Sequence, residues 1–231
     1  MVSQLSPAWQ RRPASSGRPA RAHGQIPDGT PENTRDQAPC RAIPFLLDNA
    51  GQNRIVRQLA EVLNQRGHSA SLYPPEQHPH ACSAEELAAQ AGLEHGKTEF
   101  CLLPFLSPHA LQRWPLDHVV LLVPAELDAV LLAYRRIKLL SCTRPPDIGI
   151  VMIGPRDQHA AWRYFRKLAV GTLRYLDVPL LNLGFLPQQA DSDHSTDDSY
   201  RHNFMTRISE RLVGSEFCTP LQAGEEDREK P

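Results

Sequence analysis

The sequence lacks an excess of charge of either sign, an apolar run long enough to cross a membrane, and any Cys-x-x-Cys pair. Its 231 residues include 25 lysines and arginines against 26 aspartates and glutamates. This balance excludes a general nucleic-acid binder, which carries a basic surplus. The five cysteines are scattered and odd in number, as is typical of a reducing cytosol rather than of a disulfide framework. Without a spanning run or a signal-peptide core, we expect a soluble, cytoplasmic protein.

Proline, in contrast, is abundant, with 21 residues that gather near the start and in the expected loops. Residues 1–40 are rich in Pro, Ser, Gly and Arg and offer little that can form a core, which predicts a disordered tail. The charged residues 215–231 predict a second disordered tail. One folded domain is expected between them, over residues 41–214, and it is long enough to bury a substantial core.

Short apolar segments alternate with amphipathic segments throughout residues 41–214. Short runs of Val, Ile and Leu are typical of strands covered on both faces, and regular alternation with helices predicts a mostly parallel sheet between helix layers. The predicted fold class is therefore a three-layer α/β fold. The expected strands cover residues 42–47, 69–73, 99–103, 118–123, 148–153 and 180–183. The expected helices cover residues 53–66, 83–92, 127–140, 158–176 and 200–213.

The turn between the first expected strand and helix has the position of a phosphate-binding loop. It reads Asp48-Asn49-Ala50-Gly51-Gln52-Asn53-Arg54. Phosphate loops use small residues so that consecutive backbone N–H groups converge on the anion, while a lysine and a magnesium ion cancel its charge. The glycines and the lysine are almost all missing here. The segment therefore has the position of a phosphate-binding loop but lacks the residues that bind phosphate.

A longer stretch, residues 118–188, resembles a known family. Its first part contains Val119-Val120-Leu121-Leu122-Val123-Pro124-Ala125-Glu126, Asp128-Ala129 and Ala133-Tyr134-Arg135-Arg136-Ile137-Lys138-Leu139-Leu140. Its second part contains Phe165-Arg166-Lys167-Leu168, Tyr175-Leu176-Asp177-Val178 and Leu183-Gly184-Phe185-Leu186-Pro187. The order and spacing resemble the MinD/ParA branch of P-loop ATPases, and most of all the FlhG (FleN, YlxH) flagellar-number regulators. Residues 118–188 carry the most specific motifs, but the likeness as a whole covers roughly 140–170 residues, the size of a domain. It implies a degenerate P-loop NTPase-like fold.

The resemblance places the family's nucleotide-binding elements on residues that lack the required chemistry. The family's Lys-Gly-Gly-x-Gly-Lys-Ser/Thr loop falls on residues 47–53, where only Gly51 matches. Gln52 stands where the family has the phosphate-gripping lysine, and Asn53 where it has the magnesium-binding hydroxyl. The remaining replacements are Leu47 for the first lysine and Asp48 and Asn49 for the two glycines after it. Asp48 thus puts a negative charge where phosphate oxygens would lie.

Two further elements of the family are also replaced. Pro104 occupies the place of the aspartate that holds magnesium, and Gly154 lies where the family has its base-recognition asparagine. Because phosphoryl transfer depends on positioning and electrostatic stabilisation, we expect a pseudo-ATPase with no catalytic residues and no ATP or magnesium cofactor. Weak nucleotide binding, and an ATPase-type switch with an atypical loop, remain as alternatives.

The resemblance also implies protein partners. FlhG proteins carry an N-terminal Asp-Gln-Ala-x-x-Leu-Arg segment that contacts the FlhF GTPase, and Asp36-Gln37-Ala38 matches its start while Arg41 replaces the leucine. We therefore expect a scaffold in flagellar assembly, flagellar-number control or cell-pole placement. Its partner would be an FlhF-like GTPase, a transcriptional activator or an ATPase paralogue. An accessory subunit of an exopolysaccharide or cellulose secretion system is the alternative, and a homodimer is left open.

Three other features are interpreted as structural. His78, His80 and Cys82 lie in a Pro-rich loop without a second ligand pair, so a solvated loop is favoured over a metal site. The lysines Lys97, Lys138 and Lys167 could bring charge to a phosphate from elsewhere in the fold, but for Lys138 a surface or packing role is favoured. The helix over residues 200–213 has an apolar face that a MinD-like membrane helix would also show, but we favour packing on the sheet. Peripheral attachment at the membrane or cell pole stays open as an alternative.

Overall fold

A sheet of seven strands forms the centre of the described part of the chain. In this computed structural model that part comprises residues 40–73, 98–112, 114, 117–142, 146–188, 195–214 and 219–220, all within the unit Asp36–Pro231. Six strands are parallel, in the order β2-β3-β1-β4-β5-β6, and β7 pairs with β1 in the antiparallel direction. The strands are β1 (Arg41–Leu46), β2 (Ala70–Leu72), β3 (Phe100–Phe105), β4 (His118–Pro124), β5 (Asp147–Ile153), β6 (Leu180–Leu186) and β7 (Thr219–Pro220).

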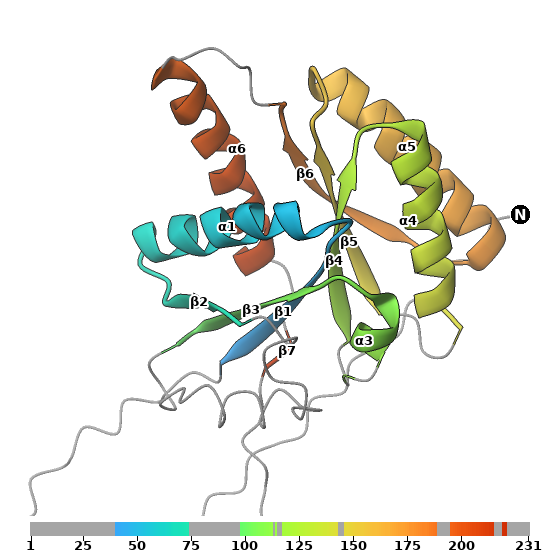
Figure 1. Cartoon of the computed structure of the whole chain (residues 1–231), viewed down its shortest axis with the longest axis horizontal. Coiled ribbons are helices and arrows are strands. Elements are labelled where there is room, and N and C mark those ends of the chain that lie inside the picture. The colour runs from blue at the N-terminus through green and yellow to red at the C-terminus, as the bar shows by residue number, and fades with distance from the viewer. Residues whose placement is uncertain are drawn as a thin grey trace, which may run out of the picture. The chain divides into compact units, whose positions relative to one another are not determined.

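Helices cover both faces of the sheet, as Figure 1 shows. The α-helices are α1 (Asn53–Gln65), α3 (Pro108–Gln112), α4 (Leu127–Leu140), α5 (Gln158–Leu176) and α6 (Ser195–Gly214), and a short 3-10 turn, η1 (Ala50–Gln52), precedes α1. One apolar cluster joins the sheet to α1 and α6, and the other joins it to α3, α4 and α5. The three-layer α/β fold predicted from the sequence is confirmed.

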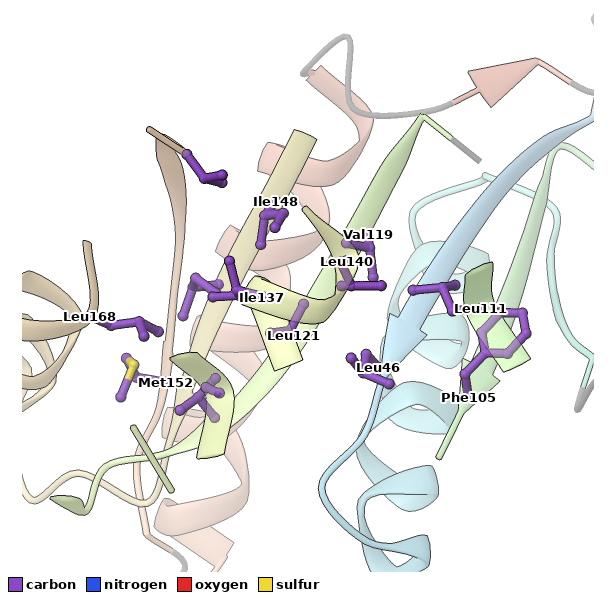
Figure 2. Packing of buried hydrophobic residues seen from close by; sticks show 14 of the residues in the cluster. Leu46, Phe105, Leu111, Val119, Leu121, Ile137, Leu140, Ile148, Met152 and Leu168 are labelled. Carbon is purple, nitrogen blue, oxygen red and sulfur yellow. The ribbon is translucent and has the colours of Figure 1, made fainter. Parts of the chain in front are cut away.

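The central strand β1 contributes to both clusters. Ile43 and Phe45 pack with α1 and α6, whereas Ala42 and Leu46 pack with the helices on the other face. Figure 2 shows the second cluster, in which Leu46 lies among apolar side chains of the sheet and of α3 and α4. All four β1 side chains are at most 1% exposed. Burying a large apolar side chain contributes about 1.5–3 kcal/mol, so this strand anchors the turn that follows it.

Two prolines lie within buried strands at positions where no backbone donor is needed. Pro44 is in β1, between the residues that pair with β7, which end at Ala42, and those that pair with β4, which begin at Phe45. Pro104 is in β3 opposite Phe45, beyond the last residue that β2 pairs. Because proline has no N–H to donate to a ladder, both positions tolerate it without a lost hydrogen bond.

Several helix and strand limits agree with the sequence, and others do not. The helices α4 and α5 have the predicted limits, and the first five strands differ by at most two residues at either end. The sixth strand continues to Leu186 rather than stopping at 183. Gly184 explains the difference, because it adopts a φ of +133° at a register shift between β5 and β6. A glycine inside a strand often marks such a bulge and does not end the strand.

Besides the 3-10 turn η1, the structure adds two elements that the sequence did not predict. The short helix α3 begins after Ser107, whose side-chain oxygen accepts a hydrogen bond from the backbone N–H of His109 at 3.3 Å. Thr219 and Pro220 form β7, although residues 215–231 were expected to be a disordered tail. That expectation is wrong for these two residues, because the start of β1 has an edge that β4 leaves unpaired. The helix expected over residues 83–92 lies outside the described residues.

The apolar face of the last helix is buried. Met205, Ile208 and Leu212 of α6 are at most 2% exposed and belong to the cluster that contains α1. Packing on the sheet, the interpretation favoured from the sequence, accounts for this face. Among the helices that the structure describes, none has the length and apolar character needed to cross a membrane.

Candidate functional site

The turn between β1 and α1 lies where open α/β sheets commonly bind ligands. The chain continues from β1 to β2 and β3 on one side of that strand, and β4, β5 and β6 lie on the other. Ligands of such sheets bind outside the carboxyl ends of the strands, at the point where the strand order reverses. Asp48, Asn49, Gly51, Gln52 and Asn53, the candidate residues of the first turn, are all gathered there.

The backbone of this turn does not form an anion-binding concavity. Asn49 is extended, with φ −150° and ψ 164°, and the 3-10 turn η1 then leads directly into α1. Gln52 donates its backbone N–H to the carbonyl oxygen of Asn49 at 3.1 Å. None of residues 48–53 has a left-handed backbone conformation. Anion-binding nests alternate right- and left-handed residues so that their N–H groups converge, and this turn has no such alternation.

The side chain of Gln52 fills the interior of the turn. It is only 6% exposed, one of three buried polar residues in the described part of the chain. Its Oε1 accepts a hydrogen bond from the backbone N–H of Asp48 at 2.8 Å. The sequence resemblance places Gln52 at the position of a phosphate-binding lysine, and here its neutral side chain occupies the backbone N–H of Asp48.

Arg136, from the helix α4, holds the same turn from the opposite side. Its Nη1 donates a hydrogen bond to the carbonyl oxygen of Leu47 at 3.0 Å, and its Nη2 lies 3.5 Å from Oδ1 of Asp48. The two side chains are 16% and 27% exposed, respectively. The negative charge that the sequence places at the phosphate position is thus paired with a cation from 88 positions further along the chain. The sequence alone does not reveal this role of Arg136, because no local pattern links it to the turn.

The start of α1 carries no acidic cap. Gln52 is the N-cap residue but makes no side-chain capping hydrogen bond, and the first turn has no acidic residue. Asn53, expected at the magnesium position, has a buried Oδ1 without a hydrogen-bond partner among the described residues. Gly51 is exposed, and a Cβ added there would come within 3.0 Å of only the Asn49 side chain, which can move. The glycine is therefore not required by backbone geometry.

The other two candidate positions lie at the same edge of the sheet and carry no functional group. Pro104 is buried in the β3 ladder, and the partly buried apolar residue Leu106 follows that strand. Gly154 follows β5 with a φ of +74° and donates its N–H to the carbonyl oxygen of Leu186 at 2.8 Å. Neither position offers an oxygen ligand or a charge to the β1–α1 turn.

The structure describes two of the remaining predicted residues, Lys138 and Lys167. Asp36, Gln37 and Ala38 lie outside the described residues, as do His78, His80, Cys82 and Lys97. Lys138 is exposed in the last turn of α4, and Lys167 is exposed with its Nζ 5.8 Å from the centre of the Tyr164 ring. Both lysines are on the surface, which agrees with the surface or packing role favoured for Lys138.

Two cysteines at the other end of the sheet are poor nucleophiles. Burial raises the pKa of the Cys40 thiol to about 11. Burial, together with the neighbouring Cys40, raises the pKa of Cys101 in β3 further. Because the thiolate is the reactive form of cysteine, neither group is poised for nucleophilic attack at neutral pH.

Comparison with known proteins identifies the fold. No family model matches the chain, and no curated protein matches its sequence. Among solved structures, MinD of Aquifex aeolicus has a TM-score of 0.50 at 12% identity, with 79% of this chain and 100% of that chain covered. The chain has the fold of MinD. A chain of the MinC:MinD cell division complex of the same organism gives a TM-score of 0.51 at 13% identity, with coverages of 80% and 99%.

This MinD-like fold carries a closed turn at its candidate site. Gln52 accepts the backbone N–H of Asp48, and Arg136 binds the carbonyl oxygen of Leu47 and the carboxylate of Asp48. The exposed residues of the turn form a small surface that a partner could contact; they are Asn49, Ala50, Gly51 and Arg54. The turn therefore presents an exposed surface and not an anion-binding concavity.

Proposed function

We propose that this protein is a non-hydrolysing, MinD-like scaffold that acts through protein contacts and not through nucleotide turnover. The observation that carries this proposal is the closed β1–α1 turn, in which Gln52 accepts the hydrogen bond of the Asp48 N–H at 2.8 Å. An entering phosphate would have to displace this buried amide and would then meet the carboxylate of Asp48. The phosphate-binding lysine and the magnesium-binding aspartate that would offset this cost are replaced by Gln52 and Pro104.

The electrostatics of the turn support the same proposal. Phosphate loops concentrate positive potential through N–H groups, a lysine and magnesium. Here one of the two nearby cations, Arg136, is paired with Asp48 at 3.5 Å, and the other, Arg54, is exposed to solvent. Water and salt screen the charge of an exposed arginine, so it attracts a nucleotide only weakly.

The pathway and the partner are proposed from the resemblance of residues 118–188 to FlhG-type regulators. We assign the scaffold to flagellar assembly, flagellar-number control or cell-pole placement, with an FlhF-like GTPase, a transcriptional activator or an ATPase paralogue as partner. The MinC:MinD complex supports this proposal to the extent that a protein of this fold forms a complex with another protein. The proposed contact surfaces are the Asp36–Arg41 segment and the exposed residues of the β1–α1 turn. The proposed location is the cytoplasm or its membrane surface at a cell pole.

Calorimetric titration of the full chain with ATP and magnesium tests the central claim. We expect no measurable heat of binding at ATP concentrations up to about 1 mM, which corresponds to a binding free energy weaker than about −4 kcal/mol. The variant Gln52→Ala, which opens the turn without adding charge, should also fail to bind. A micromolar dissociation constant for the unmodified chain would contradict the proposal and favour the atypical ATPase switch.

A second experiment tests the partner. An FlhF-like GTPase, if one is found in the same genome, is immobilised, and binding of the full chain is compared with that of a variant in which Asp36 and Gln37 are alanine. We expect the double substitution to weaken binding, while Arg57→Ala on the exposed face of α1 should not. Equal binding by both variants would remove this segment from the proposal. Genes for polysaccharide secretion beside this gene would favour the alternative pathway.

A further inference from the structure

A groove of about 160 Å³ crosses the last strand of the sheet, between α5 and α6. Figure 1 shows β6 between these two helices, at the end of the sheet opposite to β2. The floor of the groove is apolar and includes Phe165, Leu183, Phe185 and Ile208. It lies on a different part of the molecule from the β1–α1 turn, and the proposed function does not use it.

Side chains already satisfy part of the β6 backbone at this groove. Arg211 donates from Nη1 to the carbonyl oxygen of Asn182 at 2.9 Å. The side-chain Oδ1 of Asn182 in turn accepts the N–H of Gly184 at 2.9 Å. Edge strands blocked in this way resist the addition of another strand. The groove is therefore suited to receive a side chain rather than to extend the sheet.

Aromatic side chains line the groove and continue onto the surface. Trp162, which is 51% exposed, stacks on Phe165 with ring centres 5.5 Å apart. On the other side, Phe204 packs against Phe185 at 4.6 Å and against Tyr200 at 4.8 Å. Single exposed apolar residues are ordinary, but contiguous groups around a pocket mark contact surfaces. A half-exposed tryptophan beside a pocket is typical of a binding hot spot.

The charged side chains that line the groove are of one sign. Among the described residues, its polar lining consists of Gln158, Asn182, Arg207 and Arg211, and no acidic residue lines it. Arg207 is exposed and has no hydrogen bond or ion pair among the described residues. Small-molecule sites usually measure about 300–1,000 Å³, so a groove of about 160 Å³ accommodates a single large side chain rather than a whole ligand.

We propose that this groove docks a short acidic peptide segment of a partner protein. The segment inserts one large apolar side chain, preferably aromatic, between α5 and α6, where it contacts Trp162 and the apolar floor. Its neighbouring carboxylates lie against Arg207 and Arg211. Charge complementarity identifies the occupant, because the two charged side chains in the described lining are both arginines and favour a negatively charged segment.

Selection of random short peptides displayed on phage, with the full chain as target, tests this proposal. We expect the selected peptides to share one aromatic or large aliphatic residue flanked by Asp or Glu. The strongest peptide is then synthesised with a fluorescent label, and its affinity is measured by anisotropy. Trp162→Ala should weaken binding about tenfold or more, as for an aromatic anchor, and Arg207→Glu about fivefold, as for an exposed charge at the rim. Arg57→Glu on α1 makes the same charge change elsewhere and should have no effect.

Four results would overturn the proposal. The first is a selection that yields no binder, or binders without acidic residues. The second is a selected peptide that binds Trp162→Ala and Arg207→Glu as well as it binds the unmodified chain. The third is a clear gain of peptide affinity on removal of residues 221–231, because the chain's own acidic tail would then be the occupant. The fourth is a dimer in sedimentation that Arg207→Glu converts to monomers, because a second copy would then fill the groove.

Discussion

The turns after β1 and after β5 start helices at the same edge of the sheet, yet different interactions hold them. After β5, Gly154 takes a left-handed conformation and Asp157 caps α5 by accepting the N–H of Ala160 at 2.7 Å. After β1, no residue is left-handed and no side chain caps α1. Instead, Gln52 and Arg136 bind the backbone from inside the turn and from α4.

The difference separates a turn built on local chemistry from one built on long-range contacts. Asp157 sits at the helix start and satisfies a donor three residues later, a common N-cap arrangement. The β1–α1 turn depends on a buried amide and on an arginine from a distant helix. A phosphate loop leaves its donors for the ligand, whereas this turn uses Asp48 N–H internally. The comparison suggests four substitutions, in decreasing order of expected effect.

Gln52→Ala should produce the largest loss of stability. It leaves the N–H of Asp48 without its acceptor in a turn where the side chain is 6% exposed. An unsatisfied buried donor costs about 1–3 kcal/mol, and we expect a loss of about 2 kcal/mol in the free energy of unfolding, measured with urea. Gln58→Ala, at an exposed position of α1, is the control. Equal losses for both variants would show that Gln52 does not hold the turn.

Gly154→Ala should destabilise the protein by about 1–2 kcal/mol, because an L-residue in the left-handed region carries this cost. Space is not the reason, since a Cβ added at Gly154 would meet no atom within 4 Å. Gly214→Ala, also in open space but without a positive φ, should be neutral or slightly stabilising. Chemical unfolding of both variants checks the prediction, and a neutral Gly154→Ala would contradict it.

Asp157→Ala should cost about 1 kcal/mol, the usual effect of removing a side-chain cap. Asp157→Asn keeps an oxygen that can accept the N–H of Ala160 and should retain most of the stability. Thermal unfolding of the two variants separates capping from charge. If both variants lose the same stability, the negative charge of Asp157, and not its hydrogen bond, supports the start of α5.

Asp48→Asn should have the smallest effect, of about 0.5 kcal/mol or less. The carboxylate lies 3.5 Å from Arg136 and is partly exposed, and such ion pairs contribute little. The effect should shrink further at high salt. A double-mutant cycle with Arg136→Gln measures the coupling. A coupling energy above about 2 kcal/mol would show that this pair, and not Gln52, closes the turn.

The sequence predicted the layers of the fold because its local signals agree with each other. The limits of α4 and α5 follow from apolar periodicity, and the strands are short Val- and Ile-rich runs. It missed β7 because two residues carry no periodicity and pair with β1 only through the folded sheet. It also missed α3, because a helix of 5 residues is too short to show an apolar periodicity. It ended the sixth strand early because glycine weakens a strand signal even where it forms a bulge.

The position of the candidate turn was predictable, but its closure was not. The missing lysine and glycines are visible in the sequence. From the sequence, the side chain of Gln52 is a possible hydrogen-bond donor to a ligand. In the structure, its Oε1 instead accepts a hydrogen bond from the backbone N–H of Asp48. The contact of Arg136 with Leu47 joins residues 89 positions apart. Such contacts depend on how α4 packs beside β1, which no local sequence pattern specifies.

The split edge of β1 also sets an order of assembly. Phe45 and Leu46 pair with β4, but Arg41 and Ala42 pair with Thr219 and Pro220, from the far end of the described chain. In a chain synthesised from its N-terminus, the first pairing can form long before the second. Pairing between distant segments is slow because a long loop must close. The edge of β1 that faces β7 therefore gains its partner only after residues 219–220 have been made, although β1 itself is the first strand to be made.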